Sequence, residues 1–227
     1  MTNSCPCSGG LRRAMLRDFR RYLYQLDGEG HATFSNIVRA LVLYPGIWAV
    51  VPYRITHHCL HRIRPRRLGR ALAVTPFIGQ RIAIILFGIE IDSHAHIGPG
   101  LFINHFGGII IGPARLGANC NVNQGVTVGR STLTPGTLQA DVPTVGDRVW
   151  LGPGVVVAGP ITLGSDSTIA ANSLVVRDVP DRGVARGVPA EIVSFRGSFR
   201  QISYQGMEED PERVLAFTEA DGPDGVR

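Results

Sequence analysis

One histidine stands in a setting that suits proton transfer. His105 lies in the segment Ile103–Gly108 (INHFGG) and is soon followed by two glycines. Imidazole titrates near neutral pH, so it can accept a proton from an attacking hydroxyl group while it is mostly unprotonated. The sequence contains no lysine, since all 23 basic residues are arginines, and this excludes lysine bases and Schiff-base chemistry. His105 is therefore of a side-chain type that could serve as a base.

A repeat of six residues defines the elements that must position this histidine. Such a period fits neither an amphipathic helix nor a simple alternating strand, and it is typical of a parallel β-helix built from hexapeptides. A Val- and Gly-rich β-sandwich is the alternative, which the regularity of the repeat disfavours. Aliphatic residues recur at this period at Val145, Leu151, Val157, Leu163, Ile169 and Val175, and earlier at Ile91, Ile97, Ile103, Ile109, Leu116, Val122 and Val128, with one extra residue after Ile109.

The geometry of such a coil brings a carboxylate towards His105. Three hexapeptide faces close a coil of about 18 residues, and coils stack about 4.8 Å apart. Glu90 precedes His105 by 15 residues, so it is expected in a neighbouring coil close to the histidine. Small residues follow many of the aliphatic ones, and we expect them to let the chain turn. The segment 130–143 interrupts the repeat, and a loop of that length inside a strict solenoid is usually functional.

The rest of the chain divides around this repeat. We predict a basic α-helical region over 1–87, the β-helix over 88–191 with its loop 130–143, and a C-terminal tail over 192–227. Residues 11–26 place apolar side chains at helical spacing, and 36–64 continue as helix with a break at Pro45-Gly46. Residues 71–87 are expected to form an apolar helix or an extended approach to the repeat.

Charge is distributed unevenly over the two halves. Residues 1–81 carry 13 arginines against Asp18, Asp27 and Glu29, whereas 82–227 are mildly acidic. The basic region favours peripheral contact with anionic lipid, whereas no aromatic-basic motif supports nucleic-acid binding. The apolar stretch 71–91 is interrupted by Pro76 and Arg81, among others, so no membrane span is expected. Without an evident signal peptide, the prediction is a soluble, cytoplasmic protein.

Several segments carry a family resemblance, namely Tyr44–Ala49 with Tyr53-Arg54, Gly88–Asp92, Ile103–Gly112, Asn123–Gly129 and Gly187–Ala190. Together with the repeat, they resemble the serine acetyltransferase family of left-handed β-helix acyltransferases. The resemblance covers roughly residues 36–196. It implies a mainly β fold, a left-handed parallel β-helix of hexapeptide repeats behind a short α-helical N-terminal region, and acetyl-CoA-dependent O-acetyltransferase activity. It also implies a homotrimer or a dimer of trimers and no metal.

The resemblance assigns roles to individual residues. His105 would take the proton of an acceptor hydroxyl that attacks the acetyl thioester directly, and Glu90, where the family has Asp, would orient the imidazole. Acetyl-CoA would lie in a groove between adjacent subunits, held by backbone amides and small residues. The candidates for this cofactor site are Gly152, Gly154, Ala170 and Ala171, with Arg186 for the CoA phosphates.

Two positions depart from the serine-specific pattern. Those enzymes have Asp before the catalytic histidine and His before the proline that re-enters the repeat, where this chain has Asn104 and Val142. With Asp92, these are the candidate acceptor-binding residues. A neutral amide and an aliphatic side chain cannot replace a carboxylate and an imidazole. We therefore expect a saccharide or a hydroxylated metabolite as acceptor and a closer match to polysaccharide-cluster relatives, with serine or homoserine as the alternative. The C-terminus lacks the isoleucine used for docking cysteine synthase, so no such partner is expected.

Other function classes fit less well. A zinc carbonic anhydrase needs three convergent histidines, and His94, His96 and His105 lack the required spacing. A non-catalytic hexapeptide scaffold remains the alternative from another class. His57, His58 and His61 lie on the basic segment and are expected to face solvent or anions. The four cysteines show neither a disulfide framework nor a paired metal motif.

Overall fold

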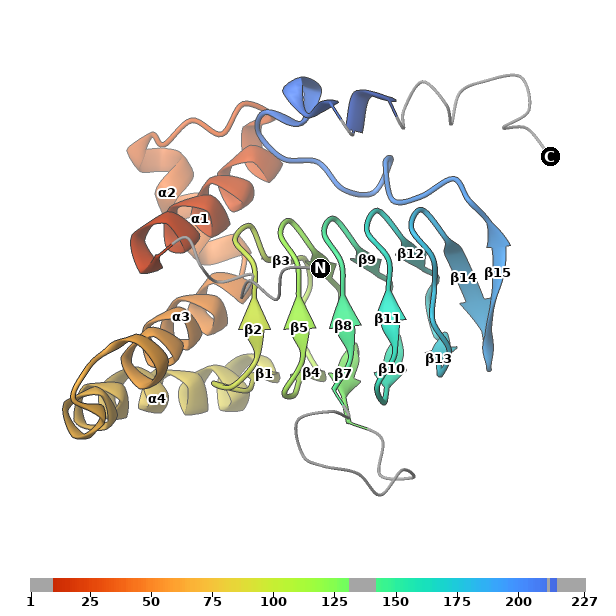
Figure 1. Ribbon diagram of the computed structural model, residues 1–227. Helices are drawn as coiled ribbons and strands as arrows, with labels where there is room; N and C mark the ends of the chain where they lie inside the picture. Colours follow the sequence, from red (N-terminus) through yellow and green to blue (C-terminus); the bar gives the residue numbers. More distant parts are fainter. Residues whose placement is uncertain (1–9, 131–141, 212, 216–227) are drawn as a thin grey trace.

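Four helices lead into a solenoid of short parallel strands. The computed structural model describes residues 10–130, 142–211 and 213–215. Figure 1 shows the helices gathered at one end of the solenoid, with the strands following one another along its axis. The helices are α1 (Leu11–Asp27), α2 (Phe34–Leu43), α3 (Gly46–Arg62) and α4 (Arg66–Phe87), and a 3-10 turn, η1 (Met207–Glu209), lies near the C-terminus.

The strands form the three faces of a parallel β-helix, which confirms the predicted architecture. Sheet A has the order β1-β4-β7-β10-β13, sheet B β11-β8-β5-β2 and sheet C β15-β14-β12-β9-β6-β3. Only β15 runs antiparallel to its neighbour. The strands are β1 (Ile89–Ile91), β2 (His96–Ile97), β3 (Phe102–Ile103), β4 (Ile109–Ile111), β5 (Arg115–Leu116), β6 (Asn121–Val122), β7 (Thr127–Gly129), β8 (Thr144–Val145), β9 (Trp150–Leu151), β10 (Val156–Ala158), β11 (Thr162–Leu163), β12 (Thr168–Ile169), β13 (Leu174–Val175), β14 (Val184–Gly187) and β15 (Ala190–Ser194).

The six-residue period fills the axis of the solenoid with aliphatic side chains. Residues in register stack directly, as Leu116 on Val145 and Val145 on Leu163. These side chains are at most 2% exposed. Stacking therefore gives one continuous apolar core, in which each coil buries its neighbour's apolar surface.

Close stacking explains the small residues that follow the buried aliphatic ones. A Cβ on Gly98 would lie 2.6 Å from the carbonyl carbon of Gly117, and one on Gly146 would lie 2.6 Å from the amide nitrogen of Ser165. Neither glycine has a positive φ. At these positions glycine is therefore required by the approach of the next coil, and not by the turn conformation expected from the sequence.

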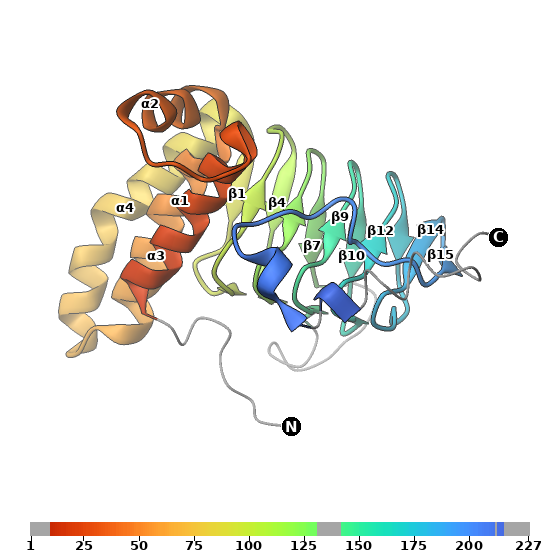
Figure 2. The same cartoon turned by 90° about the horizontal axis from the view of Figure 1, so that it is seen from above.

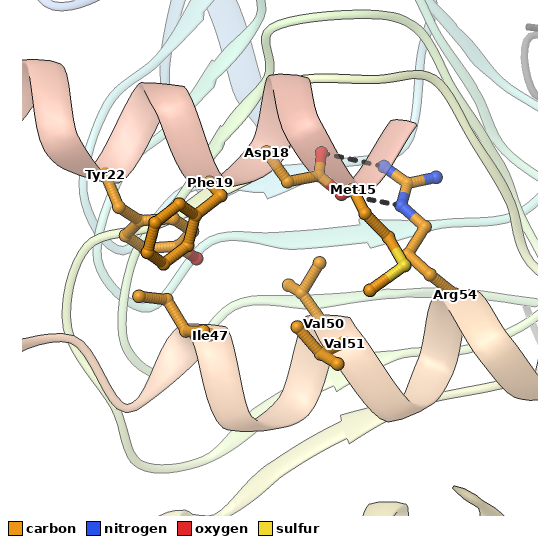
Figure 3. Close-up of a pocket in the computed structure, with 8 residues that line it drawn as sticks. All are labelled: Met15, Asp18, Phe19, Tyr22, Ile47, Val50, Val51 and Arg54. Carbon is orange, nitrogen blue, oxygen red and sulfur yellow. Dashed lines mark hydrogen bonds and ion pairs between the residues drawn. The ribbon is translucent and has the colours of Figure 1, made fainter. Parts of the chain in front are cut away.

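A buried ion pair fixes the helical region to the first coil. Arg54 on α3 donates to the Asp18 carboxylate on α1 through Nε (2.8 Å) and Nη2 (3.0 Å), and Nη2 also donates to the carbonyl of Gly98 (2.6 Å). The same carboxylate accepts from the backbone amides of Gly100 and Leu101. Figure 3 shows this pair beside the apolar contact between α1 and α3. Both carboxylate oxygens of Asp18 thus help to hold the helices on the solenoid.

The C-terminal segment returns along the solenoid to the helices (Figure 2). Arg21 on α1 is buried and donates to the carbonyls of Gly100 (2.8 Å) and Ser203 (3.3 Å) and to the side-chain oxygen of Asn121. Burial lowers the pKa of Arg21 to about 10. One guanidinium thus joins the first helix, two coils and the returning segment. Because β15 extends to Ser194, the last strand continues past the boundary placed after residue 191.

Helix α4 is a single continuous helix that contains Pro76, Gly79 and Arg81. By length and composition it is the one helix in the described ranges that could cross a membrane, although α2 and α3 pass the same test as a pair bent by 93°. Only 17% of the most apolar window of α4 is buried. Its inner side packs closely on α3, where a Cβ on Gly69 would lie 2.3 Å from the carbonyl oxygen of Cys59. Its outer side is exposed.

Candidate functional site

The corner between sheets C and A presents the candidate base. After β3 the chain turns through residues 104–108 and enters β4. Gly107 (φ 101°) and Gly108 (φ 66°) adopt backbone conformations that favour glycine. The preceding coil also lies close, since a Cβ on Gly88 would be 3.1 Å from the amide nitrogen of Gly108. The two glycines after the histidine therefore turn the corner and leave room for the stacked chain.

His105 projects from this corner as an exposed side chain, and Glu90 lies next to the corner on β1. Residue 90 is in register with Ile110 of the following coil, which places its half-buried side chain on the outer surface of sheet A. Within the described part of the chain, neither side chain has a hydrogen bond or an ion pair. The two residues lie on adjoining parts of the solenoid, and their direct contact stays a prediction.

An asparagine pair aligns the next corner with the histidine corner. Asn104 donates through its amide to Asn123 Oδ1 (3.3 Å), and Asn123 in turn donates to the carbonyl of Leu151 (2.8 Å). This register places Gln124 next to His105 in the stack. Gln124 Oε1 is buried and has no hydrogen-bond donor among the described residues. A buried acceptor without a donor is costly unless a ligand supplies one.

Gln124 is the site residue that sequence reasoning missed. It belongs to the motif Asn123–Gly129, but nothing in the sequence distinguishes it from any other polar corner residue. The only signal is structural, namely an unpaired buried oxygen beside the candidate base.

The proposed cofactor residues continue along the same edge of the solenoid. Gly152 and Gly154 lie in the third corner of this stack, and Ala170 and Ala171 lie in the fourth. A Cβ on Gly152 would lie 2.8 Å from the carbonyl oxygen of Ile169, so this glycine is required for stacking. Ala171 is exposed and available to a ligand. Since neighbouring coils are about 4.8 Å apart, the edge offers an extended track that begins at His105.

Arg186 stands at the far end of this edge. It is exposed on β14, next to Glu191 of β15 in the antiparallel register. The structure therefore leaves Arg186 accessible to an anionic group, with an acidic residue beside it.

The remaining acceptor candidates lie at a different corner. Asp92 follows β1 in the corner between sheets A and B, and it accepts from the backbone amide of His94 (2.7 Å). Val142, half-buried, precedes β8 at the same corner two coils further on. The loop 130–143 joins the strands there, and its residues 131–141 lie outside the described residues. Sheet A thus separates Asp92 and Val142 from His105 within one chain.

An aromatic contact lies directly beside the base. Phe106 is 56% exposed, and its ring meets that of Phe87 edge-on at 6.3 Å between centroids. Ile110 on the neighbouring strand is also exposed. An apolar platform therefore adjoins the imidazole at the start of the corner track.

Four histidines gather at the junction of α3 with the first coil, and this corrects the expectation for His57. Its ring is buried, 4.5 Å from the ring of His61 and 5.2 Å from that of His96 between centroids, and His94 lies 5.6 Å from His61. Burial lowers the pKa of His57 to about 4 and also lowers those of His61 and His96. The sequence places α3 and β2 too far apart to reveal this cluster.

Metal ligation is not evident in this cluster. Across 10–130, 142–211 and 213–215, no group of three or more His, Cys, Asp or Glu side chains is placed to hold a metal ion. Cys59 and Cys120 are buried free thiols, and burial raises the pKa of Cys120 to about 12.

Fold and corner motifs together define a hexapeptide-repeat transferase. Residues 143–177 match the family model described as bacterial transferase hexapeptide (six repeats). Serine acetyltransferase from Helicobacter pylori is 38% identical over 160 residues, which are 70% of this chain and 87% of that protein. Serine acetyltransferase from Mycobacterium tuberculosis is 39% identical over 157 residues, 69% of this chain and 64% of that longer protein.

Solved structures of the same class superpose on the chain. Serine acetyltransferase from Brucella abortus in complex with coenzyme A has a TM-score of 0.61 at 26% identity and covers 81% of this chain and 67% of its own. The Neisseria gonorrhoeae enzyme in complex with serine has a TM-score of 0.61 at 27% identity, covering 83% and 71%.

The chain belongs to the serine acetyltransferase family, and it is an acetyl-CoA-dependent acyltransferase. The relatives named above are all serine acetyltransferases, so the expected closer match to polysaccharide-cluster relatives is not supported.

Proposed function

We propose that this protein acetylates the hydroxyl group of serine with acetyl-CoA, using His105 as general base. The observation that carries the proposal is the corner at residues 104–108, which presents an exposed imidazole at the start of a track of small residues. The names of the curated relatives support serine as the acceptor.

The proposed reaction needs only one proton relay. His105 accepts the proton of the acceptor hydroxyl while its oxygen attacks the carbonyl carbon of the thioester. The tetrahedral intermediate collapses with cleavage of the C–S bond, and the imidazolium returns the proton to the departing CoA thiolate. Glu90 would stabilise the cationic imidazole once acceptor and cofactor enclose the corner.

A homotrimer would complete this site. Within one chain, sheet A separates His105 from Asp92 and Val142. A neighbouring copy that places its A–B corner against this C–A corner would bring the two sets together. Hexapeptide β-helix transferases are typically trimeric, and the split between the two corners supports the same assembly here.

A saccharide hydroxyl is the second candidate acceptor. Phe106 offers an exposed aromatic face next to His105, and the apolar face of a sugar ring can pack on such a surface. Asn104 can hydrogen-bond a hydroxyl group but cannot neutralise the ammonium group of an amino acid.

An acceptor screen decides between the two candidates. CoA release is measured with purified protein, acetyl-CoA and, in turn, serine, homoserine and nucleotide- or lipid-linked sugars. Serine as the acceptor with the highest kcat/KM supports the proposal. Turnover with a sugar and none with serine supports a saccharide hydroxyl as the acceptor instead. If none of these acceptors stimulates the release of CoA, both acceptor assignments are overturned.

A further inference from the structure

We infer that the outer side of α4 is a membrane-docking surface that binds anionic phospholipid. The inference is independent of the acetyl-transfer chemistry, because this helix precedes the solenoid and its outer side faces away from the core. The surface, named here the α4 outer face, consists of Leu68, Leu72, Val74, Ile78, Ile82, Ile85 and Leu86, each about half exposed or more.

The sequence of α4 makes the helix apolar on two opposite sides. Ala73 and Ala83 are buried on the inner side together with Gln80, whose side chain donates to the carbonyl of Ile91 (3.0 Å). Val74, Ile78 and Ile82 recur every four residues and therefore align along the other side. A helix that is apolar on two opposite sides requires a second apolar environment for the side that faces away from the core. The protein core covers only one of the two apolar sides.

Exposure on this scale is unusual for a soluble surface. Ile85 is 81% exposed and Leu86 63%, next to five further aliphatic side chains on the same helix. Scattered apolar residues need no explanation, but a continuous apolar strip along a helix of 22 residues marks an interaction site. At 1.5 Å per residue the strip, which runs from Leu68 to Leu86, is about 27 Å long.

Charge complementarity selects the occupant. Residues 31–89 contain eight arginines and no acidic residue. Arg67, Arg70 and Arg81 are exposed on α4 itself. Arginines beside an apolar face suit the interface of a bilayer, where aliphatic groups enter the acyl region and guanidinium groups meet lipid phosphates.

A second copy related by a two-fold axis is a poorer occupant of the same face. A two-fold contact would set the α4 outer face against itself. Arg67, Arg70 and Arg81 of one copy would then approach those of the other, with no carboxylate between residues 31 and 89 to compensate. Like-charge contact opposes that assembly, whereas an anionic lipid surface neutralises the same arginines.

The packing of α4 also favours a helix that lies on the membrane surface over one that crosses the membrane. One side of α4 is held against α3 by close contacts at Gly69 and at Gly79, where a Cβ would lie 3.1 Å from the Cβ of Pro52. A spanning helix would have to leave this packing and the Gln80 bond. A helix that lies in the plane of the interface keeps both.

Vesicle sedimentation tests the inference with the full chain. Wild-type protein is mixed with vesicles of phosphatidylcholine alone or with added phosphatidylglycerol. We expect binding to the anionic vesicles, weakening with salt, and little binding to the neutral ones. The triple variant Arg67→Gln, Arg70→Gln, Arg81→Gln should bind the anionic vesicles about a hundredfold more weakly, since each arginine near an anionic surface contributes about a factor of five.

An apolar variant and a matched control complete the experiment. Leu72→Gln, Ile78→Gln, Ile82→Gln should also abolish sedimentation with vesicles while CoA release is unchanged. Val176→Gln, Val193→Gln, Phe195→Gln replaces three exposed apolar residues outside α4 and should bind as wild type does. Wild-type protein that ignores anionic vesicles overturns the inference. A second outcome also overturns it. If the wild-type protein does not bind vesicles but forms an assembly that only the Leu72→Gln, Ile78→Gln, Ile82→Gln variant dissociates, a second copy occupies the face.

Discussion

At the scale of single residues, His105 is the position on which the proposed chemistry depends. Replacing it with alanine should lower kcat by about 10²–10⁴, the usual contribution of a general base, and leave CoA binding nearly intact. Steady-state rates and CoA titration of the variant measure the two effects. His31→Ala, an exposed histidine in the connection between α1 and α2, serves as the control. Wild-type turnover by His105→Ala would rule out the assignment.

Gln124 should act on the acceptor and not on the cofactor. Its buried Oε1 lacks a donor in the free protein, so a bound acceptor can supply one. Gln124→Leu should raise the KM for the acceptor about two- to tenfold, the value of one ordinary hydrogen bond, with the KM for acetyl-CoA unchanged. An equal rise in both constants would indicate a structural role only.

At the scale of elements, the contact of α1 with α3 depends on one buried carboxylate. Asp18→Ala should lower the free energy of unfolding by about 3–5 kcal/mol, because the Arg54 guanidinium remains buried without its counter-ion. Urea unfolding of the two proteins measures the loss. Glu29→Gln, which removes an exposed carboxylate paired with His31, should change stability by less than about 1 kcal/mol. Similar losses for both variants would contradict the buried-pair interpretation.

The histidine cluster makes the junction of α3 and the first coil sensitive to acid. The pKa of His57 falls from 6.5 to about 4 on folding, so between these values the unfolded chain binds more protons than the folded one. Stability should therefore decrease as pH falls from about 6.5 towards about 4. His57→Gln should reduce the slope of stability against pH by roughly one proton in this window.

Thermal unfolding between pH 4 and 7 provides the measurement. His58→Gln, one residue away and outside the cluster, controls for substitution on the same helical turn. An unchanged slope in His57→Gln would mean that other groups cause the acid sensitivity.

The hexapeptide elements were predictable from the sequence because each face of the coil is about six residues long and points one aliphatic side chain into the axis. Ile97 and Leu116 lie in the axis where the period placed them. Segment 71–87 could not be assigned between helix and extended chain, since Pro76 argues against a helix that packing on α3 nevertheless stabilises. The neighbours of His57 could not be foreseen either, because contacts between α3 and β2 depend on how the helices dock.

At the scale of the whole molecule, the split between two corners predicts complementation between subunits. His105→Ala and Asp92→Asn should each lower activity. If one chain contributes His105 and its neighbour Asp92, trimers assembled at random from the two variants should recover up to about a quarter of wild-type activity. The measurement is CoA release after unfolding and refolding the variants together and separately. A mixture as inactive as its parents would place the complete site within one chain.

The interrupted corner before β8 has a further consequence for how such a molecule can diversify. Thr162 follows its partner Thr144 by 18 residues, but Thr144 follows its partner Arg115 by 29, and both pairs keep the same register. Chain length can therefore change at that corner without disturbing the core. Insertions, deletions or grafted peptides there should be tolerated during folding, and acceptor preference can evolve at one corner while the histidine and the track for acetyl-CoA remain as they are at another.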